Sequence, residues 1–328
     1  MAEGISFTAV VGIGEILQGT DIAALIAERT DLVDGDVVVV TSKIVSKSLG
    51  LATRQDKDEV LAAQTDRVVA RRDATRIVRT HHGLTMAAAG IDASNAEPGT
   101  LLPLPSDPDA EARSIRKRLR YLTGRSVAVV ISDTAGRAWR YGQTDIAIGC
   151  AGLVAVESFA GQVDSHGQPL VVTAPAVADE IAGGAELAAG KLGRRPVVIV
   201  RGLADHLVTS DDGPGARALV RDGDSDLFGL GTREAVVASL APGGDARGFA
   251  THDINTPTLV DLALPPEGID VRLVDDRQLV VHYPPHLPVE AGQLTQRLTA
   301  LAIAHGICGL TVQAVPESPR DSDGSTCQ

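Results

Sequence analysis

The sequence is poor in aromatic residues and in cysteine. Aromatic side chains make up 2% of the 328 residues, and there is one tryptophan. The three cysteines, Cys150, Cys308 and Cys327, are far apart and have no CxxC spacing. This pattern predicts neither a disulfide framework nor a zinc site, and it fits a reducing cytoplasm. We therefore expect a cytoplasmic protein.

An excess of positive charge and long apolar runs are also missing. The net charge is −12 and the isoelectric point is about 5.1, which argues against a nucleic-acid or anionic-membrane surface. No stretch reaches the ~20 apolar residues of a membrane span, and MAEGISFTAVVGIG lacks the pattern of a secretory signal. We expect a soluble protein whose partners are small molecules.

Apolar strand patterns alternate with helix patterns, which predicts the α/β class, in a mixed α+β arrangement. Continuous apolar runs indicate strands that are covered on both faces. The expected strands are 36–42, 126–132 and 195–202, and the expected helices are 21–33, 58–72, 109–124 and 178–192.

A turn-rich region after residue 205 and the polar linker PGGDARGF suggest a division of the chain. We expect a main domain over 1–240 and a small α+β unit over 241–315, made of a hairpin, a helix and a strand. The tail 316–328 is rich in Ser, Asp and Gly, so we expect it to be disordered.

Three segments place polar groups after apolar strands, where α/β proteins position ligand sites. They are TSKIVSKSLG, AAAGIDASN and ISDTAGR. Asp133 and Thr134 could bind a divalent ion such as Mg²⁺ or Mn²⁺, Asp92 could supply a second carboxylate, and Asn95 is free to bind a ligand. The alternative is that these residues only form turns through bonds to their own backbone.

The segment TSKIVSK adds Ser42, Lys43 and Lys47, which could approach a phosphate. The alternative is a solvated lysine. Neither GxxxxGK[ST] nor GxGxxG is present, so a bound nucleotide would need another architecture. Two arginine-rich runs, over 67–79 and 113–120, are expected on helices as solvated faces. His81 and His82 are expected to be ordinary loop residues.

Six blocks in order resemble the coenzyme F420-0:γ-glutamyl ligase family over about residues 8–235. They are GDVVVVTSKIVSK, AAGIDASN, LLPLPSDPDAEA, VISDTAGRAWRYGQTDIAIGCAGL, VADEIAGGAELAAGK and PVVIVRG. The resemblance is strongest to the actinobacterial form, in which a nitroreductase-like flavin domain follows the ligase domain. It implies the ligase-like fold for the main domain.

The resemblance implies GTP-dependent ligation of L-glutamate to coenzyme F420-0 through an acyl phosphate. It also implies two divalent ions, Mg²⁺ or Mn²⁺, with K⁺ as a further candidate, and a homodimer. Divalent ions suit a phosphoryl transfer between anionic substrates.

Site residues follow from the same resemblance. Asp92 and Asp133 match the catalytic ligands of the first metal ion, and Thr134 matches a ligand of the second. Lys191 stands where a metal-binding side chain is expected, so a cation there puts the second ion in doubt. Positions matched to nucleotide contacts are Ile13, Gly14, Glu15, Ile16, Ser42, Lys47, Asn95, Gly190 and Lys191.

The single tryptophan lies in the same segment as the expected ligands. Arg137, Arg140 and Gln143 are expected to approach phosphates or the substrate tail, while Trp139 either stacks on a ring or anchors the loop.

The chain departs from the family form at its C-terminal end. A nitroreductase-like domain needs on the order of 200 residues, and about 75 ordered residues are expected after the linker. We therefore expect no FMN and no reductase activity. Two other functions stay open: a metal-dependent phosphoryl transferase or hydrolase acting on another substrate, and a catalytically silent nucleotide-binding protein.

Overall fold

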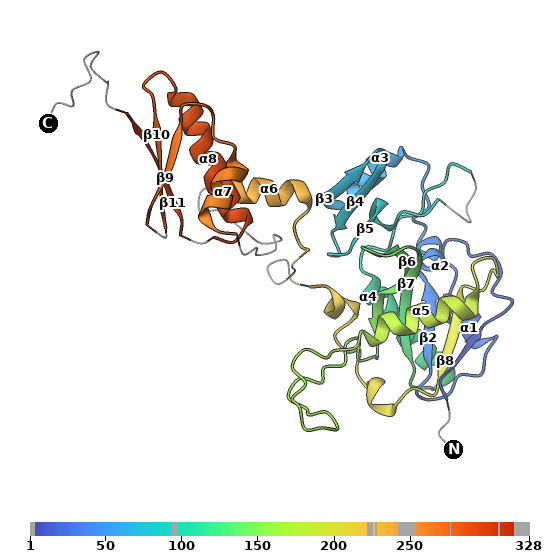
Figure 1. The fold of residues 1–328 in the computed structure, drawn as a ribbon. Helices are drawn as coiled ribbons and strands as arrows, with labels where there is room; N and C mark the ends of the chain where they lie inside the picture. Colours follow the sequence, from blue (N-terminus) through green and yellow to red (C-terminus); the bar gives the residue numbers. More distant parts are fainter. Residues whose placement is uncertain are drawn as a thin grey trace, which may run out of the picture. The chain divides into compact units, whose positions relative to one another are not determined.

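The computed structural model describes residues 4–93, 98–221, 226, 228–241, 254–275, 277–307 and 309–317. The chain forms two compact units, Met1–Asp222 and Gly223–Gln328 (Figure 1). The boundary expected at residue 240 falls within the second unit. None of the helices in the described part of the chain has both the length and the apolar character that crossing a membrane would require.

A five-stranded mixed sheet forms the centre of the first unit, in the order β1-β8-β2-β6-β7. Its central pair, β2 and β6, is parallel, and the other neighbouring pairs are antiparallel. The strands are β1 (Ser6–Ala9), β2 (Val37–Thr41), β6 (Ala128–Gly136), β7 (Gln143–Ala151) and β8 (Val197–Arg201). This architecture confirms the α/β class.

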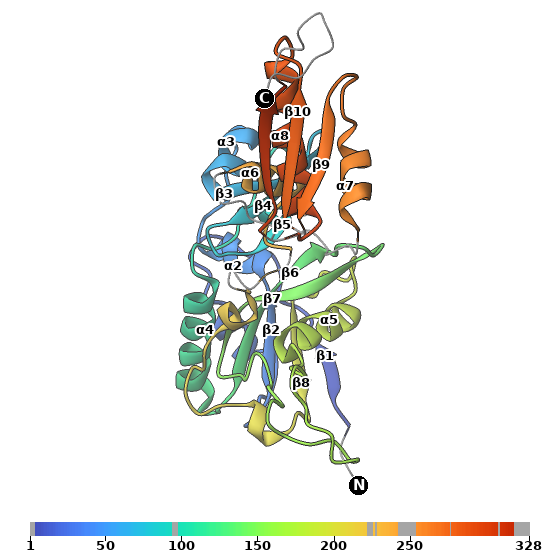
Figure 2. The same ribbon diagram turned by 60° about the vertical axis from the view of Figure 1, so that its left-hand side comes forward.

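Side chains of β2 alternate between two hydrophobic cores, as a strand that is buried on both faces requires. Val38 packs in the core that includes α1 (Ile22–Ala27) and α4 (Pro108–Thr123), and Val39 packs in the core that includes α5 (Val177–Ala189). Figure 2 shows α4 and α5 on opposite sides of the sheet. The expected two-sided covering is thus confirmed, although α1 is shorter than the expected helix 21–33.

A second, three-stranded sheet shows one sequence-based expectation to be wrong. The helix expected over 58–72 ends at Gln64 as α3 (Lys57–Gln64), and the chain continues as β3 (Thr65–Arg72), β4 (Thr75–Thr80) and β5 (Thr85–Ala87). Pairing of β3 with β4 supplies backbone hydrogen bonds between segments that both contain β-branched residues. The first arginine run therefore lies on strands.

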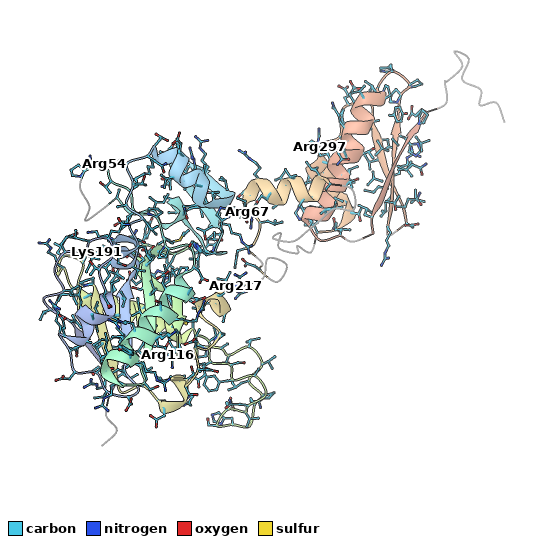
Figure 3. The ribbon with its side chains drawn as sticks, turned by 180° about the vertical axis from the view of Figure 1, so that it is seen from behind. Arg54, Arg67, Arg116, Lys191, Arg217 and Arg297 are labelled. Atoms are coloured by element: carbon cyan, nitrogen blue, oxygen red, sulfur yellow. The ribbon has the colours of Figure 1, made fainter. Side chains whose placement is uncertain are left out.

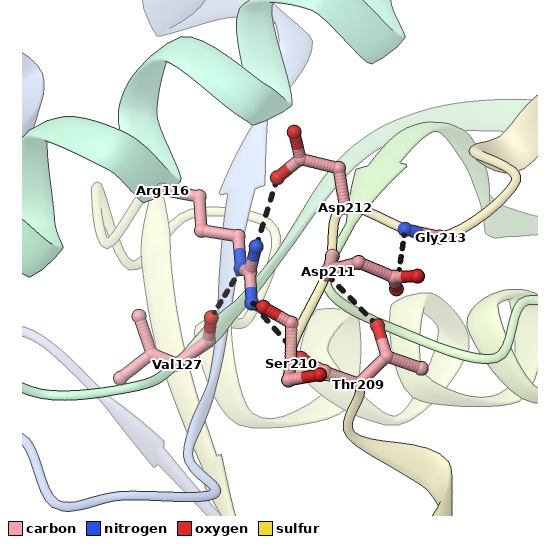
Figure 4. Close-up of polar contacts among 7 residues, drawn as sticks. All are labelled: Arg116, Val127, Thr209, Ser210, Asp211, Asp212 and Gly213. Atoms are coloured by element: carbon pink, nitrogen blue, oxygen red, sulfur yellow. Dashed lines mark hydrogen bonds and ion pairs between the residues drawn. The ribbon is translucent and has the colours of Figure 1, made fainter.

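Arg116 ties α4 to the segment that follows β8. The residue is 7% exposed, and its guanidinium donates to the carbonyls of Val127, Thr209 and Ser210 and to Asp212 Oδ1, at 2.8–3.3 Å (Figure 4). Gly152 leaves room for this group, because a Cβ there would collide with the guanidinium. Four acceptors thus depend on one buried donor group.

The second unit has its own core and confirms the expected hairpin, helix and strand. A helix α6 (Thr232–Leu240) and a helix α7 (Thr256–Ala263) precede β9 (Asp270–Asp275), β10 (Gln278–Tyr283), α8 (Pro288–Ala304) and β11 (Thr311–Pro316). β10 pairs with β9 antiparallel and with β11 in parallel. Leu279, Leu294 and Leu298 belong to this core.

We expect Arg116→Met to lower the free energy of unfolding by about 2–4 kcal/mol, because the substitution leaves the buried carbonyl of Val127 and three partly buried acceptors without this donor. Chemical unfolding of the full chain, followed by circular dichroism, measures the change. Arg120→Met is the matched control, because Arg120 is exposed on the same helix and should change stability by less than about 0.5 kcal/mol. Equal effects of the two substitutions would contradict the structural role given to Arg116.

Candidate functional site

Asp133 is a buried carboxylate near the end of β6. Ser42 opens α2 (Ser42–Ser48) directly after β2, and its Oγ donates to Asp133 Oδ1 at 2.8 Å. The two residues are 91 positions apart in the chain. They meet because β2 and β6 are parallel neighbours, with Thr41 paired to Ser132, so Ser42 and Asp133 are the next residues at the same end of this pairing.

The environment of Asp133 opposes its charge. The pKa of Asp133 is raised to about 6, mainly by burial. The Ser42 hydrogen bond and the Lys43 charge lower this pKa, and the carboxylates of Asp145 and Asp92 raise it. A carboxylate with a raised pKa, next to other carboxylates at a strand end, is typical of a functional site. It is also the group that gains most from a cation.

Lys43 links the second expected carboxylate to this group. Its Nζ lies 3.0 Å from Asp92 Oδ2, and both side chains are 20% exposed. Asp92 is positioned by an antiparallel bridge to Leu102. The structure therefore places Asp92 in the electrostatic surroundings of Asp133, and Lys43 forms an ion pair with it. Asn95 lies outside the described residues.

Thr134 belongs to a second polar cluster, whose centre is Asp145 on β7. Thr134 Oγ1 donates to Asp145 Oδ1 at 2.7 Å, and Ser132 Oγ donates to Asp145 Oδ2 at 2.9 Å. Asp145 is not among the site residues expected from the sequence. The hairpin register would have identified it, since Thr134 pairs directly with Asp145.

Lys191 reaches this second cluster from the segment after α5. Its Nζ donates to Thr134 Oγ1 at 3.3 Å and lies 4.0 Å from Glu186 Oε1. Gly190 ends α5 with a φ of +68°, which turns the chain toward this position. An ammonium group thus contacts the hydroxyl that was matched to a ligand of a second metal ion.

The expected nucleotide-contact residues near the N-terminus divide into two kinds. Ile13 and Ile16 are buried in the core, so only their backbone groups could contact a ligand. Gly14 has a φ of +76° and open space where a Cβ would be. Glu15 pairs with Lys47 through a contact of 2.6 Å. Any phosphate contact by Lys47 must therefore compete with this carboxylate.

The donor set fits a hard divalent ion only in part. Among the described residues, no group of three or more His, Cys, Asp or Glu side chains is arranged to hold a metal ion. Asp92, Asp133 and Thr134 do supply the oxygen donors that Mg²⁺ and Mn²⁺ prefer. Since Mg²⁺ is usually bound by one or two carboxylates together with substrate phosphates and water, these residues suit an ion that arrives with a nucleotide.

A pocket of about 360 Å³ lies elsewhere in the first unit. His81, His82, Asp107, Arg113 and Arg217 are among the residues that line it, and none of the expected site residues is. Figure 3 shows Arg217, from this pocket, and Lys191, from the polar cluster, on separate parts of the unit. We assign the site to the polar residues at the strand ends, because the raised pKa and the converging oxygens are found there.

The raised pKa of Asp133 predicts that the free energy of unfolding of the metal-free protein depends on pH. The folded state binds a proton more tightly than the unfolded chain, so ionisation of Asp133 lowers stability as the pH rises from about 4 to about 6. We expect Asp133→Asn to be more stable than the parent above pH 6, by about 1–3 kcal/mol, and nearly equal to it near pH 4. Unfolding with urea across this range, with EDTA present, measures the difference, and exposed Asp31→Asn is the control.

Comparison with known proteins adds an independent line of evidence. The family model "F420-0:Gamma-glutamyl ligase" matches residues 52–202. The chain is also similar to the coenzyme F420:L-glutamate ligases of three archaea. For Methanothermobacter thermautotrophicus, identity is 36% over 251 residues, covering 69% of this chain and 99% of the relative.

For Methanopyrus kandleri, identity is 36% over 235 residues, covering 65% of this chain and 93% of the relative. For Archaeoglobus fulgidus, identity is 38% over 214 residues, covering 59% of this chain and 86% of the relative. Such similarity over nearly the whole length of two relatives shows that this chain belongs to the F420-0:γ-glutamyl ligase family.

Proposed function

We propose that this protein ligates L-glutamate to a coenzyme F420 precursor and takes part in the biosynthesis of that coenzyme. The observation that carries the proposal is the similarity over nearly the full length of two coenzyme F420:L-glutamate ligases. The arrangement of Asp133, Ser42 and Asp92 at one edge of the sheet supports it.

We further propose that GTP drives the reaction in two steps. In the first, a carboxylate oxygen of the acceptor attacks the γ-phosphorus of GTP, which forms an acyl phosphate and releases GDP. In the second, the neutral amine of L-glutamate attacks the acyl carbon. A C–N bond forms, the bond from carbon to the phosphate oxygen breaks, and the amine proton passes to solvent as phosphate leaves.

We assign the residues of the site different roles in this reaction. Asp133, Asp92 and Thr134 would hold a divalent ion, which neutralises phosphate charge when it is bound. Ser42 holds the carboxylate of Asp133 in place. Lys43 and Lys191 contribute positive charge beside these groups, which opposes the repulsion between anionic substrates and an acidic protein.

Mass spectrometry of the acceptor after incubation with F420-0, GTP, L-glutamate and Mn²⁺ tests the proposal. We expect products heavier by one or more glutamyl residues, and a loss of rate of about 10³-fold or more in Asp133→Asn. GTP hydrolysis without glutamate addition would instead favour the phosphohydrolase alternative. If the protein neither bound GTP nor turned it over, this result would contradict the nucleotide-dependent mechanism.

The contact between Lys191 and Thr134 leads to a separate prediction. If the Lys191 ammonium supplies charge to the nucleotide phosphates, Lys191→Gln should raise the KM for GTP by about tenfold or more. The same substitution should make the rate depend more steeply on the Mn²⁺ concentration, because Thr134 becomes available to a second ion. Lys117→Gln, an exposed lysine on α4, is the matched control. An unchanged KM and an unchanged metal dependence would exclude this role.

A further inference from the structure

The connection between β6 and β7 is exposed over its whole length. Residues 136–143 are all exposed, with Trp139 at 89% and Tyr141 at 103% of their reference surface. The hairpin extends beyond the other strands of the sheet (Figure 2). The expectation that Trp139 anchors the loop by partial burial is therefore wrong, since its ring lies in solvent.

The backbone at this tip is strained. Trp139 has a φ of +65°, a conformation that costs a non-glycine residue on the order of 1–2 kcal/mol. Burial of the Trp139 ring does not offset this strain, because the ring is exposed to water. The only tryptophan of the chain thus has a strained backbone and an exposed ring, which indicates a role in binding rather than in packing.

Two arginines accompany the aromatic rings. Arg137 Nη2 donates to the carbonyl of Tyr141 at 3.1 Å, which ties the two sides of the tip together. In the part of the chain that the structure describes, neither Arg137 nor Arg140 forms an ion pair with a carboxylate. Two uncompensated guanidinium groups on a protein of net charge −12 are suited to an anionic ligand.

The hairpin connects this tip directly to the candidate site. Asp133 and Thr134 lie on β6, and Asp145 lies on β7. Six residues separate Asp133 from Trp139, so the rise of a strand places the ring at most about 20 Å from the carboxylate. Along β6 and into the tip, the order is Asp133, Arg137 and Trp139, and Arg140 lies between the two aromatic residues.

We propose that the tip binds the ring system of the acceptor, with Trp139 stacked on it and with Arg137 on the phosphodiester. This inference rests on the proposed function. In a deazaflavin acceptor, a planar ring, a phosphodiester and the carboxylate to be ligated follow one another along one chain. That order matches the order of groups along the hairpin, so the acceptor lies along β6 and β7 with its carboxylate at Asp133.

Binding of the fluorescent deazaflavin F420-0 to the full chain, measured by fluorescence anisotropy, tests the inference without turnover. We expect Trp139→Ala to raise the dissociation constant by at least tenfold, and Trp139→Phe to stay within about threefold of the parent, because it keeps a stacking ring. Tyr121→Ala is the control, because Tyr121 is 79% exposed on α4, away from the hairpin.

Kinetics supplies a second readout. Loss of stacking weakens binding of the acceptor equally in the ground and transition states. Trp139→Ala should therefore raise the KM for F420-0 with little change in kcat. The KM values for GTP and L-glutamate should stay unchanged. A change in the KM for GTP instead would mean that the nucleobase occupies the tip. A change in oligomeric state on size exclusion would mean that a second copy of the chain does. Either result would overturn the inference.

Failure of the inference can be separated from failure of the proposed function. If the parent protein ligates glutamate and Trp139→Ala binds F420-0 as tightly as the parent, the inference is overturned and the proposed function stands. If the parent neither binds the deazaflavin nor extends it, the proposed function fails, and the inference fails with it.

Discussion

The parallel pairing of β2 with β6 is the constraint on which the rest of the site depends. It brings Ser42, directly after β2, next to Asp133 of β6, and the Ser42 hydroxyl donates to the Asp133 carboxylate. The cores on both faces hold this pair in place, with Val38 and Val39 pointing to opposite sides. A buried carboxylate with a raised pKa is tolerated there because the surrounding structure over-determines its position.

Electrostatics explains why lysine side chains lie at this edge of the sheet in an acidic protein. Asp133 is influenced by the carboxylates of Asp92 and Asp145, and Lys43 reduces the resulting repulsion. Lys191 stands beside Thr134 on the Asp145 cluster. These lysines are fixed positive charges, so the site can receive anionic phosphates even though the net charge of the chain is −12. A divalent ion would complete the same compensation.

The β6–β7 hairpin combines two roles that the sequence places next to each other. Its buried part carries Asp133 and Asp145 and belongs to the sheet, whereas its exposed part carries Trp139 and the arginines. A rigid base with an exposed tip suits a ligand that must be held at two distant points, because the strands set the distance between them. The proposed chemistry and the proposed recognition are thus assigned to one continuous element.

The sequence by itself determined the alternation of strands and helices, the position of Asp133 and Thr134 directly after an apolar run, and the small C-terminal hairpin, helix and strand. The expected strand 126–132 continues through both residues to Gly136. These features depend on local apolar patterns and turn residues, which a single chain segment carries. The tertiary structure decided what local patterns cannot show. Residues 65–72 became a strand because a partner strand was available to pair with it. Lys43 joined Asp92, and Asp145 joined Thr134, because contacts between distant segments depend on strand order and register, which no local pattern contains.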